Sequence, residues 1–227
     1  MLPYYLLYST DFNPDVIHEL SSGSQIGIKS LTDDTPYSSI IKSDIQEFPD
    51  YITYNLKTET LKKQKGRAYG QTISFDSFIL IKNDLMFFNA DNNLLLISTS
   101  KDNFNKFTKR FANNTSFNFS TVSVNFKSIL DSPLNLSTDS LWLDIRESIN
   151  LNAVGLMGHE VRVSNDFQKY LESGAEITNI SFSYNYNGTP VKIMISKDGG
   201  IILFQSKPTP EDLPLTIDVY KKMLLQS

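Results

Sequence analysis

The fold class is decided by the stretch Ile177-Thr-Asn-Ile-Ser-Phe-Ser-Tyr-Asn-Tyr186, which Asn187-Gly188 follows directly. Its apolar residues alternate with polar ones, which is the period of a strand with one buried face. Asn-Gly is the preferred dipeptide of a two-residue hairpin turn, because both positions accept a positive φ. We therefore predict a hairpin that returns through residues 191–196, turns at residues 197–200 and completes a three-stranded meander over residues 201–206.

A second set of apolar runs lies upstream, at residues 72–81, 85–89 and 94–98. The separators Lys82-Asn-Asp84 and Ala90-Asp-Asn-Asn93 have the composition of turns. These runs predict a three-stranded antiparallel meander. A capping-box-like start at Thr99-Ser-Lys-Asp102 then predicts a helix as far as about residue 112.

The fold class predicted from these patterns is α+β, with two sheet-plus-helix units built on antiparallel meanders. We place an N-terminal domain at residues 1–135 and a C-terminal domain at residues 136–227, joined through the Pro-containing segment 132–139. Shorter patterns predict strands at residues 4–8 and 25–29 and helices at residues 15–20, 166–172 and 215–225. Residues 36–65 fit either a strand or a helix edge and stay unassigned.

Charge is unevenly distributed along the chain. The whole protein has a net charge of −4, but residues 57–110 hold ten basic and five acidic residues, so the remainder carries −9. An acidic protein with a local cationic patch is typical of one that meets an anionic partner from one side. The candidate nucleic-acid-binding residues form two groups, Lys62, Lys63, Lys65 and Arg67, and Lys101, Lys106, Lys109 and Arg110.

The predicted helix arranges its residues on two faces. Phe104, Phe107 and Phe111 repeat at helical spacing and predict the buried face, whereas the stripe Lys106, Lys109 and Arg110 predicts an exposed one. If nucleic acid binds there, we expect contact with the duplex backbone, weak sequence preference and strong salt dependence. Two alternatives remain open, a solvated surface whose cations suit a helix C-terminus and a site for an acidic protein.

Catalytic patterns are missing from the sequence. There is no cysteine, which excludes disulfides, thiolate ligands and cysteine nucleophiles and fits a reducing compartment. His18 and His159 belong to no catalytic or metal-ligating pattern, and the glycines of residues 66–70 predict a turn rather than a P-loop. We predict no catalytic residue, no metal and no cofactor, with a metal-dependent nuclease kept as an alternative.

Hydropathy predicts a cytoplasmic protein. No window reaches the roughly 18 consecutive apolar residues of a membrane-spanning helix. The apolar N-terminal residues have no basic segment before them and no cleavage pattern after them, so we interpret them as a strand rather than a signal peptide.

Two stretches give the chain a likeness to a known family. They are Ser77-Phe-Ile-Leu-Ile-Lys-Asn-Asp-Leu-Met-Phe-Phe88, with the polar segment and helix after it, and Asn152-Ala-Val-Gly-Leu-Met-Gly-His-Glu-Val-Arg-Val163, with the helix and meander after it. In pattern and order these resemble RexA-type phage exclusion proteins. The resemblance implies a two-domain homodimer that binds duplex DNA without sequence specificity and signals infection to a membrane-associated protein partner. It implies no catalytic residues.

A different function class also fits the sequence. The chain could be a protein-interaction or immunity-type module that binds no nucleic acid. It would then recognise its partner through an exposed sheet edge or through the strand that carries Tyr184 and Tyr186.

Overall fold

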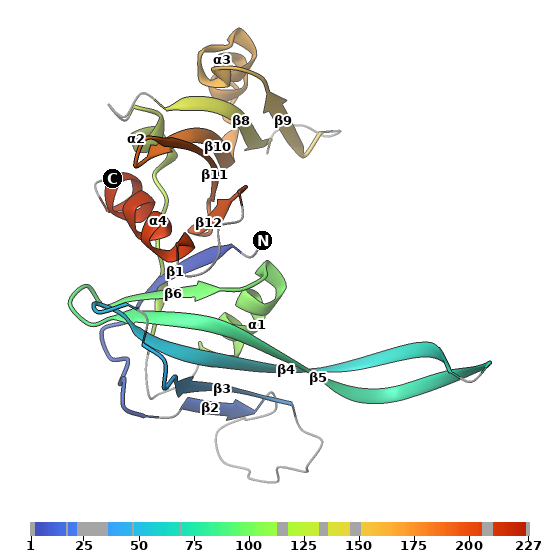
Figure 1. Cartoon of the computed structure of the whole chain (residues 1–227). Coiled ribbons are helices and arrows are strands. Elements are labelled where there is room, and N and C mark those ends of the chain that lie inside the picture. The colour runs from blue at the N-terminus through green and yellow to red at the C-terminus, as the bar shows by residue number, and fades with distance from the viewer. Residues whose placement is uncertain are drawn as a thin grey trace. The chain divides into compact units, whose positions relative to one another are not determined.

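The computed structural model is a mixed α+β fold built on antiparallel strand pairing (Figure 1). It describes residues 3–16, 18–21, 36–46, 48–68, 70–112, 118–131, 136–145, 151–205 and 211–225, without the side chains of 18–21, 63–68 and 73–78. The chain forms two compact units. We call residues 7–120 the arm unit, and residues 1–6 with 121–227 the meander unit.

The meander unit is built on residues 4–6 of β1 and on strands that continue the order β1-β12-β11-β10-β8-β9. Their bounds are β1 Tyr4–Tyr8, β8 Ser137–Asp144, β9 Ala153–Met157, β10 Glu176–Tyr186, β11 Thr189–Ser196 and β12 Gly200–Leu203, and the short β7, Ser120–Thr121, pairs with β1. Strand β8 therefore begins inside the segment predicted as a link, whose residues 132–135 lie outside the described part of the chain.

The predicted Asn-Gly hairpin is confirmed. Asn187 and Gly188 both have positive φ, 50° and 80°, as a turn matched to twisted strands requires. The strands on either side pair from Tyr186 with Thr189 to Asn179 with Ser196. Strand β12 completes the meander but ends at Leu203, three residues earlier than predicted.

The core of the meander unit lies on one face of this sheet. Ile180, Phe182 and Tyr184 are buried there, with the apolar residues that face them from β11 and β12. Two hydrogen bonds join the C-terminal helical segment to β10. The Tyr184 hydroxyl donates to Asp218 and accepts from Lys222 Nζ at 2.9 Å. Burial, and then the bond to Asp218, raise the pKa of the Tyr184 phenol.

Helices complete the meander unit. They are α2 Phe126–Leu130, a 3₁₀ turn at Val161–Val163, α3 Asn165–Glu172, α4 Asp212–Val219 and a π-helical turn at Tyr220–Leu224. Helix α3 confirms the prediction at residues 166–172, and Ser164 Oγ caps it by accepting from the backbone N–H of Phe167 at 3.2 Å. The last helix starts three residues before the predicted position 215, which places Pro214 in its first turn, where proline is tolerated.

The arm unit has strands in the order β2-β3-β4-β5-β6, followed by helix α1. Their bounds are β2 His18–Ser21, β3 Tyr37–Lys42, β4 Ile52–Ala68, β5 Gln71–Asn89, β6 Leu94–Ser98 and α1 Lys101–Phe111. The helix predicted at residues 15–20 is wrong, because His18–Ser21 pair with β3 instead. The strand predicted at residues 25–29 lies outside the described residues.

Strand β5 contains the largest difference from the sequence analysis. Lys82, Asn83 and Asp84 were predicted as a turn, but they lie inside one continuous strand and pair with residues 56–58 of β4. Asp84 is buried, and its Oδ2 accepts from Thr99 Oγ1 at 2.7 Å and from Asn103 Nδ2 at 3.1 Å. Asp84 therefore holds the start of α1 against β5, and the chain does not reverse at this position. The observed meander is β4-β5-β6.

Helix α1 confirms its predicted extent and buried face. Phe104, Phe107 and Phe111 are buried against the sheet. Its N-cap is Ser100, one residue later than predicted, because the Thr99 hydroxyl is used by Asp84.

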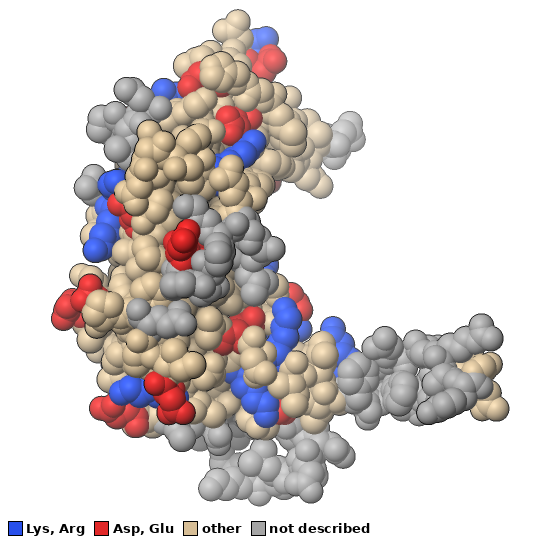
Figure 2. Space-filling model, in the orientation of Figure 1, with Lys and Arg blue, Asp and Glu red and all other residues tan. Residues whose placement is uncertain are grey.

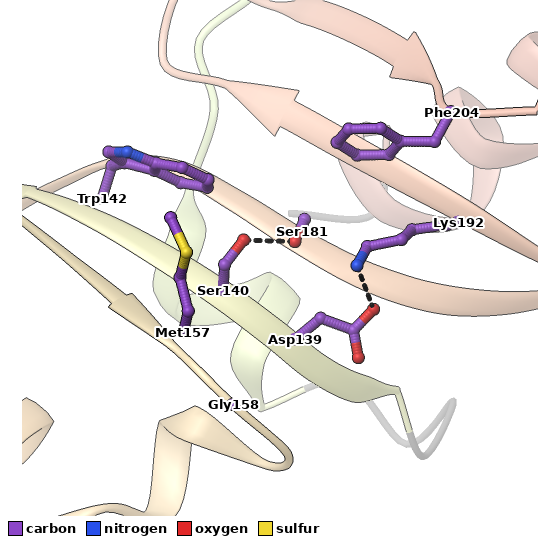
Figure 3. Close-up of a pocket in the computed structure, with 8 residues that line it drawn as sticks. All are labelled: Asp139, Ser140, Trp142, Met157, Gly158, Ser181, Lys192 and Phe204. Atoms are coloured by element: carbon purple, nitrogen blue, oxygen red, sulfur yellow. Dashed lines mark hydrogen bonds and ion pairs between the residues drawn. The ribbon is translucent and has the colours of Figure 1, made fainter.

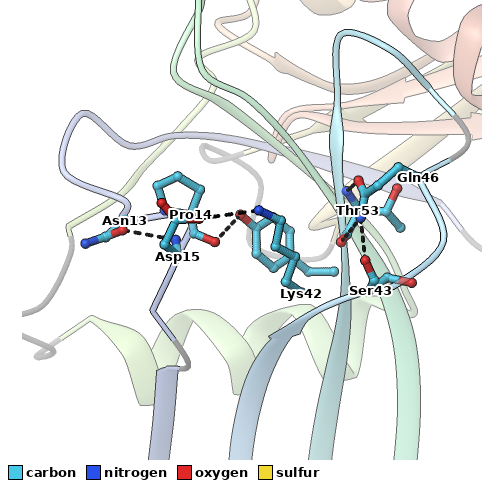
Figure 4. A network of polar contacts seen from close by, with 8 residues as sticks. Asn13, Pro14, Asp15, Lys42, Ser43, Gln46 and Thr53 are labelled. Carbon is cyan, nitrogen blue, oxygen red and sulfur yellow. Dashed lines mark hydrogen bonds and ion pairs between the residues drawn. The ribbon is translucent and has the colours of Figure 1, made fainter.

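A polar network holds the start of β4 in place (Figure 4). The amide of Gln46 accepts from the backbone N–H of Thr53 at 2.7 Å and donates to the carbonyl of Ser43. The Tyr54 hydroxyl donates to the carbonyl of Pro14 at 3.0 Å, and burial raises its pKa. The region that the sequence left unassigned is therefore β3 and the first part of β4, anchored before the hairpin leaves the sheet.

Candidate nucleic-acid interface

The outer part of the β4–β5 hairpin is an arm (Figure 1). Among the described strands, β3 pairs with β4 only as far as Thr58, and β6 pairs with β5 only from Leu85 onward. The two strands continue to pair with each other from Glu59 with Ile81 out to Ala68 with Gln71. The ten residues 59–68 of β4, at about 3.3 Å each, give the arm a length of about 33 Å.

The arm is cationic. Residues 60–82 hold five basic residues and one acidic residue, Asp76, so their net charge is +4. The basic residues are Lys62, Lys63, Lys65, Arg67 and Lys82. Near the tip, the strand register places Lys65 opposite Ser74 and Arg67 opposite Thr72. The side chains of Lys65 and Arg67 lie outside the described part of the chain. Of the turn predicted at residues 66–70, residues 66–68 still lie in β4, because Gly66 pairs with Ile73 and Ala68 with Gln71, and Gly70 lies in a turn.

At the base of the arm, one member of each predicted basic group, Lys62 and Lys106, acts on the same carboxylate. Lys106 Nζ lies 2.6 Å from Asp102 Oδ2 on the first turns of α1, and this hydrogen bond is the main reason that the pKa of the Asp102 carboxyl is lowered. The charges of Lys62 on β4 and Lys82 on β5 lower it further. The charges of cations on three elements thus act on one carboxylate. We call Lys62, Lys82 and Lys106 the cationic surface.

Lys82 is the residue of this surface that sequence reasoning missed. Its place in an expected turn separated it from both basic groups. The signal that would have found it is the strand register, in which Lys82 pairs with Thr58. Figure 2 shows basic side chains on the arm unit beside the base of the arm.

Arg110 is placed differently from the prediction. The guanidinium is half-buried and donates through Nη1 to Ser38 Oγ at 2.5 Å and through Nη2 to the Glu59 carbonyl at 2.6 Å. Burial lowers its pKa. Arg110 therefore holds α1 against β3 and β4, so the predicted exposed stripe keeps only Lys106 and Lys109. Lys101 and Lys109 are exposed on the helix.

Apolar side chains are exposed beside the cations. Leu61, Leu80 and Ile81 are 49%, 43% and 50% exposed on the inner part of the arm. A two-stranded ribbon with no third strand is marginally stable in water by itself. A surface that mixes lysines with exposed aliphatic residues is suited to contact with another molecule.

The histidines and Tyr184 are among the remaining residues that the sequence analysis considered for a site. His159 is exposed, with Nδ1 3.5 Å from Ser137 Oγ, and the side chain of His18 lies outside the description. In the part of the chain that the structure describes, no three His, Cys, Asp or Glu side chains gather closely enough to hold a metal ion. Tyr184, expected on a recognition strand, is buried and bonded to Asp218.

Comparisons with known proteins add no relative. No family model matches the chain, and no curated protein matches it. The resemblance to RexA-type proteins therefore stays a prediction. None of the helices that the structure describes is long and apolar enough to cross a membrane.

Proposed function

We propose that this chain is a non-enzymatic DNA-binding protein of phage or mobile-element type, similar to RexA exclusion proteins, and that it holds duplex DNA without sequence specificity. The observation that carries the proposal is the net charge of +4 on the arm, together with Lys62, Lys82 and Lys106, three cations from separate elements whose charges act on one carboxylate. The chain as a whole has a net charge of −4, so this density of cations is local.

The dimensions of the arm favour a duplex. A major groove about 12 Å wide accepts a two-stranded ribbon, and the length of the arm, about 33 Å, is comparable to one helical turn of the duplex measured along its axis. Four of its five cations are lysines, which meet phosphates as point charges rather than reading base edges through a planar fork. Binding of this kind is independent of sequence and depends steeply on salt.

Dimerisation and signalling belong to the same proposal. Two copies would present two arms, and the second contact would then be intramolecular and raise avidity. The resemblance to RexA-type proteins supports a homodimer and a membrane-associated protein partner.

The alternative function is protein interaction without nucleic acid. The exposure of Leu61, Leu80 and Ile81 favours it, because apolar side chains contribute little to phosphate contact. An acidic protein with an apolar patch would match both the cations and these residues. This alternative predicts no DNA retention at any salt concentration.

The test is a gel shift of the purified chain with duplex DNA across a salt series, with and without magnesium. We expect retention of intact DNA that weakens steeply as salt rises. Two duplexes of unrelated sequence should be retained equally. Cleavage in magnesium would instead indicate a nuclease, and absence of retention at low salt would contradict the proposal and favour the protein-interaction alternative.

A further inference from the structure

A cleft of about 470 Å³ opens on the sheet of the meander unit, on the face opposite the core (Figure 3). Its walls include Trp142 and Phe204, and its floor includes Ser140 and Ser181, whose hydroxyls hydrogen-bond to each other. The residues come from β8, β10 and the end of β12. All of them belong to one unit, so the cleft is independent of the proposed DNA-binding surface.

A β-bulge supplies the charged group of the cleft. Ser181 pairs with Ser140, but the next residue, Phe182, pairs with Thr138, which leaves Asp139 without a paired residue on β10. Bulges redirect the side chain of the extra residue. Here the carboxylate of Asp139 meets Lys192 Nζ from β11 at 3.3 Å.

A glycine gives the indole its position. Gly155 on β9 pairs with Trp142, and a Cβ at Gly155 would lie 3.3 Å from Trp142 Nε1. This is tighter than ordinary van der Waals contact, so glycine lets the indole lie close against the neighbouring strand. On the opposite wall, Lys192 Nζ lies 5.7 Å from the ring centroid of Phe204, which is within the range of a cation–π contact.

The apolar side chains of this cleft are unusually accessible. The solvent face of an antiparallel sheet is ordinarily polar. Here Met157 is 73% exposed, Phe204 is 48% exposed and Trp142 is partly exposed. Small-molecule sites combine such apolar walls with a few convergent polar groups in volumes of about 300–1,000 Å³.

The polar groups define the class of ligand. Lys192 and Asp139 offer a donor and an acceptor side by side, and their charges cancel, so a strongly charged ligand gains no net attraction. An aromatic ring on each wall favours a planar ligand. We propose that the cleft binds an uncharged, nucleobase-like heteroaromatic ring that contacts both Trp142 and Phe204 and directs its donor and acceptor edge to Asp139 and Lys192.

Such a ring could belong to a free nucleoside or to a base of a single strand, so the test uses both probes. Trp142 is the only tryptophan in the chain, so tryptophan fluorescence reports on this cleft alone. We expect saturable quenching by adenosine, by a short single-stranded oligodeoxyadenylate, or by both, at concentrations up to about 1 mM, after correction with free N-acetyl-tryptophanamide. Saturation by adenosine would indicate a free ligand, and saturation by the oligonucleotide alone would indicate a base in a strand.

Two variants establish that the signal comes from the cleft. Phe204→Ala should weaken binding about tenfold or more, because a stacking platform is removed. Lys169→Gln is the control, since Lys169 lies on α3 in an exposed ion pair, and it should bind like the natural chain. Circular dichroism would show that both variants fold. Quenching that does not saturate with either probe, or that Phe204→Ala leaves unchanged, would overturn the proposal.

Discussion

The two long hairpins of this chain follow different rules. In β10–β11, Ile180, Phe182 and Tyr184 alternate with polar residues, and strands flank the hairpin on both sides. In β4–β5, no such alternation runs through the arm, and its outer ten residue positions have no third strand among those described. The first hairpin contributes buried side chains to a core, whereas the outer part of the second holds its cations beyond the strands that would cover it. The comparison teaches that one hairpin builds a core, whereas the other exposes the cations on which the proposed function rests.

The largest expected difference is in core packing. Phe182→Ala should lower the free energy of unfolding by about 3–5 kcal/mol, because it removes a fully buried ring from β10. Leu80→Ala in the arm should change it by less than about 0.5 kcal/mol, since Leu80 is exposed. Urea unfolding followed by circular dichroism measures both. Equal losses would mean that the arm is packed in solution.

The next effect concerns how α1 is held beside the arm. Arg110→Ala should destabilise the protein by about 2–3 kcal/mol, because it removes charge-assisted hydrogen bonds to Ser38 and Glu59. The matched control is Lys109→Ala, at the exposed neighbouring position, which should change stability by less than about 0.5 kcal/mol. A thermal melt compares the two. If Lys109→Ala were the more destabilising, the assignment of Arg110 to structure would be wrong.

A smaller effect separates the two turns. Gly188 and Gly70 both have positive φ, 80° and 76°, so alanine is strained at each, by about 1–2 kcal/mol. Gly188→Ala should lower global stability by about that amount. Gly70→Ala should leave global unfolding nearly unchanged and instead speed amide hydrogen exchange in the arm, because the tip can open locally. The same global loss from both variants would contradict an independently opening arm.

The smallest effect is the pH dependence of stability that comes from Asp11, in the segment after β1. Asp11 Oδ1 accepts from the backbone N–H of Asn118 at 2.8 Å, and this bond is the main reason that the pKa of the Asp11 carboxyl is lowered. A depressed pKa contributes stability above the unfolded value of about 3.9, which is lost as pH falls through the lower folded value. Asp11→Asn should therefore flatten the loss of stability below about pH 4 in urea titrations. Superimposable pH profiles would exclude this contribution.

The sequence predicted the meander unit better because its signals are local. Asn187-Gly188 specifies a two-residue turn because both residues accept a positive φ, and this local signal was enough to predict the β10–β11 hairpin. The three-residue spacing from Ile177 to Ile180 also has a visible cause, since the register shifts between Ile177 and Asn179.

The arm unit was harder to predict because its decisive contacts are between distant residues. Asp84 is a residue typical of turns, but it is buried and accepts hydrogen bonds from Thr99, just before α1, and from Asn103 on α1. Helical spacing predicted an exposed Arg110, but its partners Ser38 and Glu59 are on β3 and β4, far from it in the sequence. The basic groups could be predicted from composition, but Lys82 could not join them without the register of β5.

The central claim is that the cationic surface, rather than overall charge, holds duplex DNA. The most direct test compares the triple reversal Lys62→Glu, Lys82→Glu and Lys106→Glu with a control reversal of three exposed lysines of the meander unit. The control residues are Lys127, Lys169 and Lys221. Each reversal changes the charge by −2, so both triples move from −4 to −10.

The measurement is fluorescence anisotropy of a labelled duplex at several salt concentrations. We expect the arm triple to bind at least tenfold more weakly and to lower the slope of log K against log salt by about 2–3, which is about 0.9 for each lost phosphate contact. The control triple should stay within about threefold of the natural chain and keep its slope. Equal losses in both triples, or an unchanged slope in the arm triple, would contradict the account.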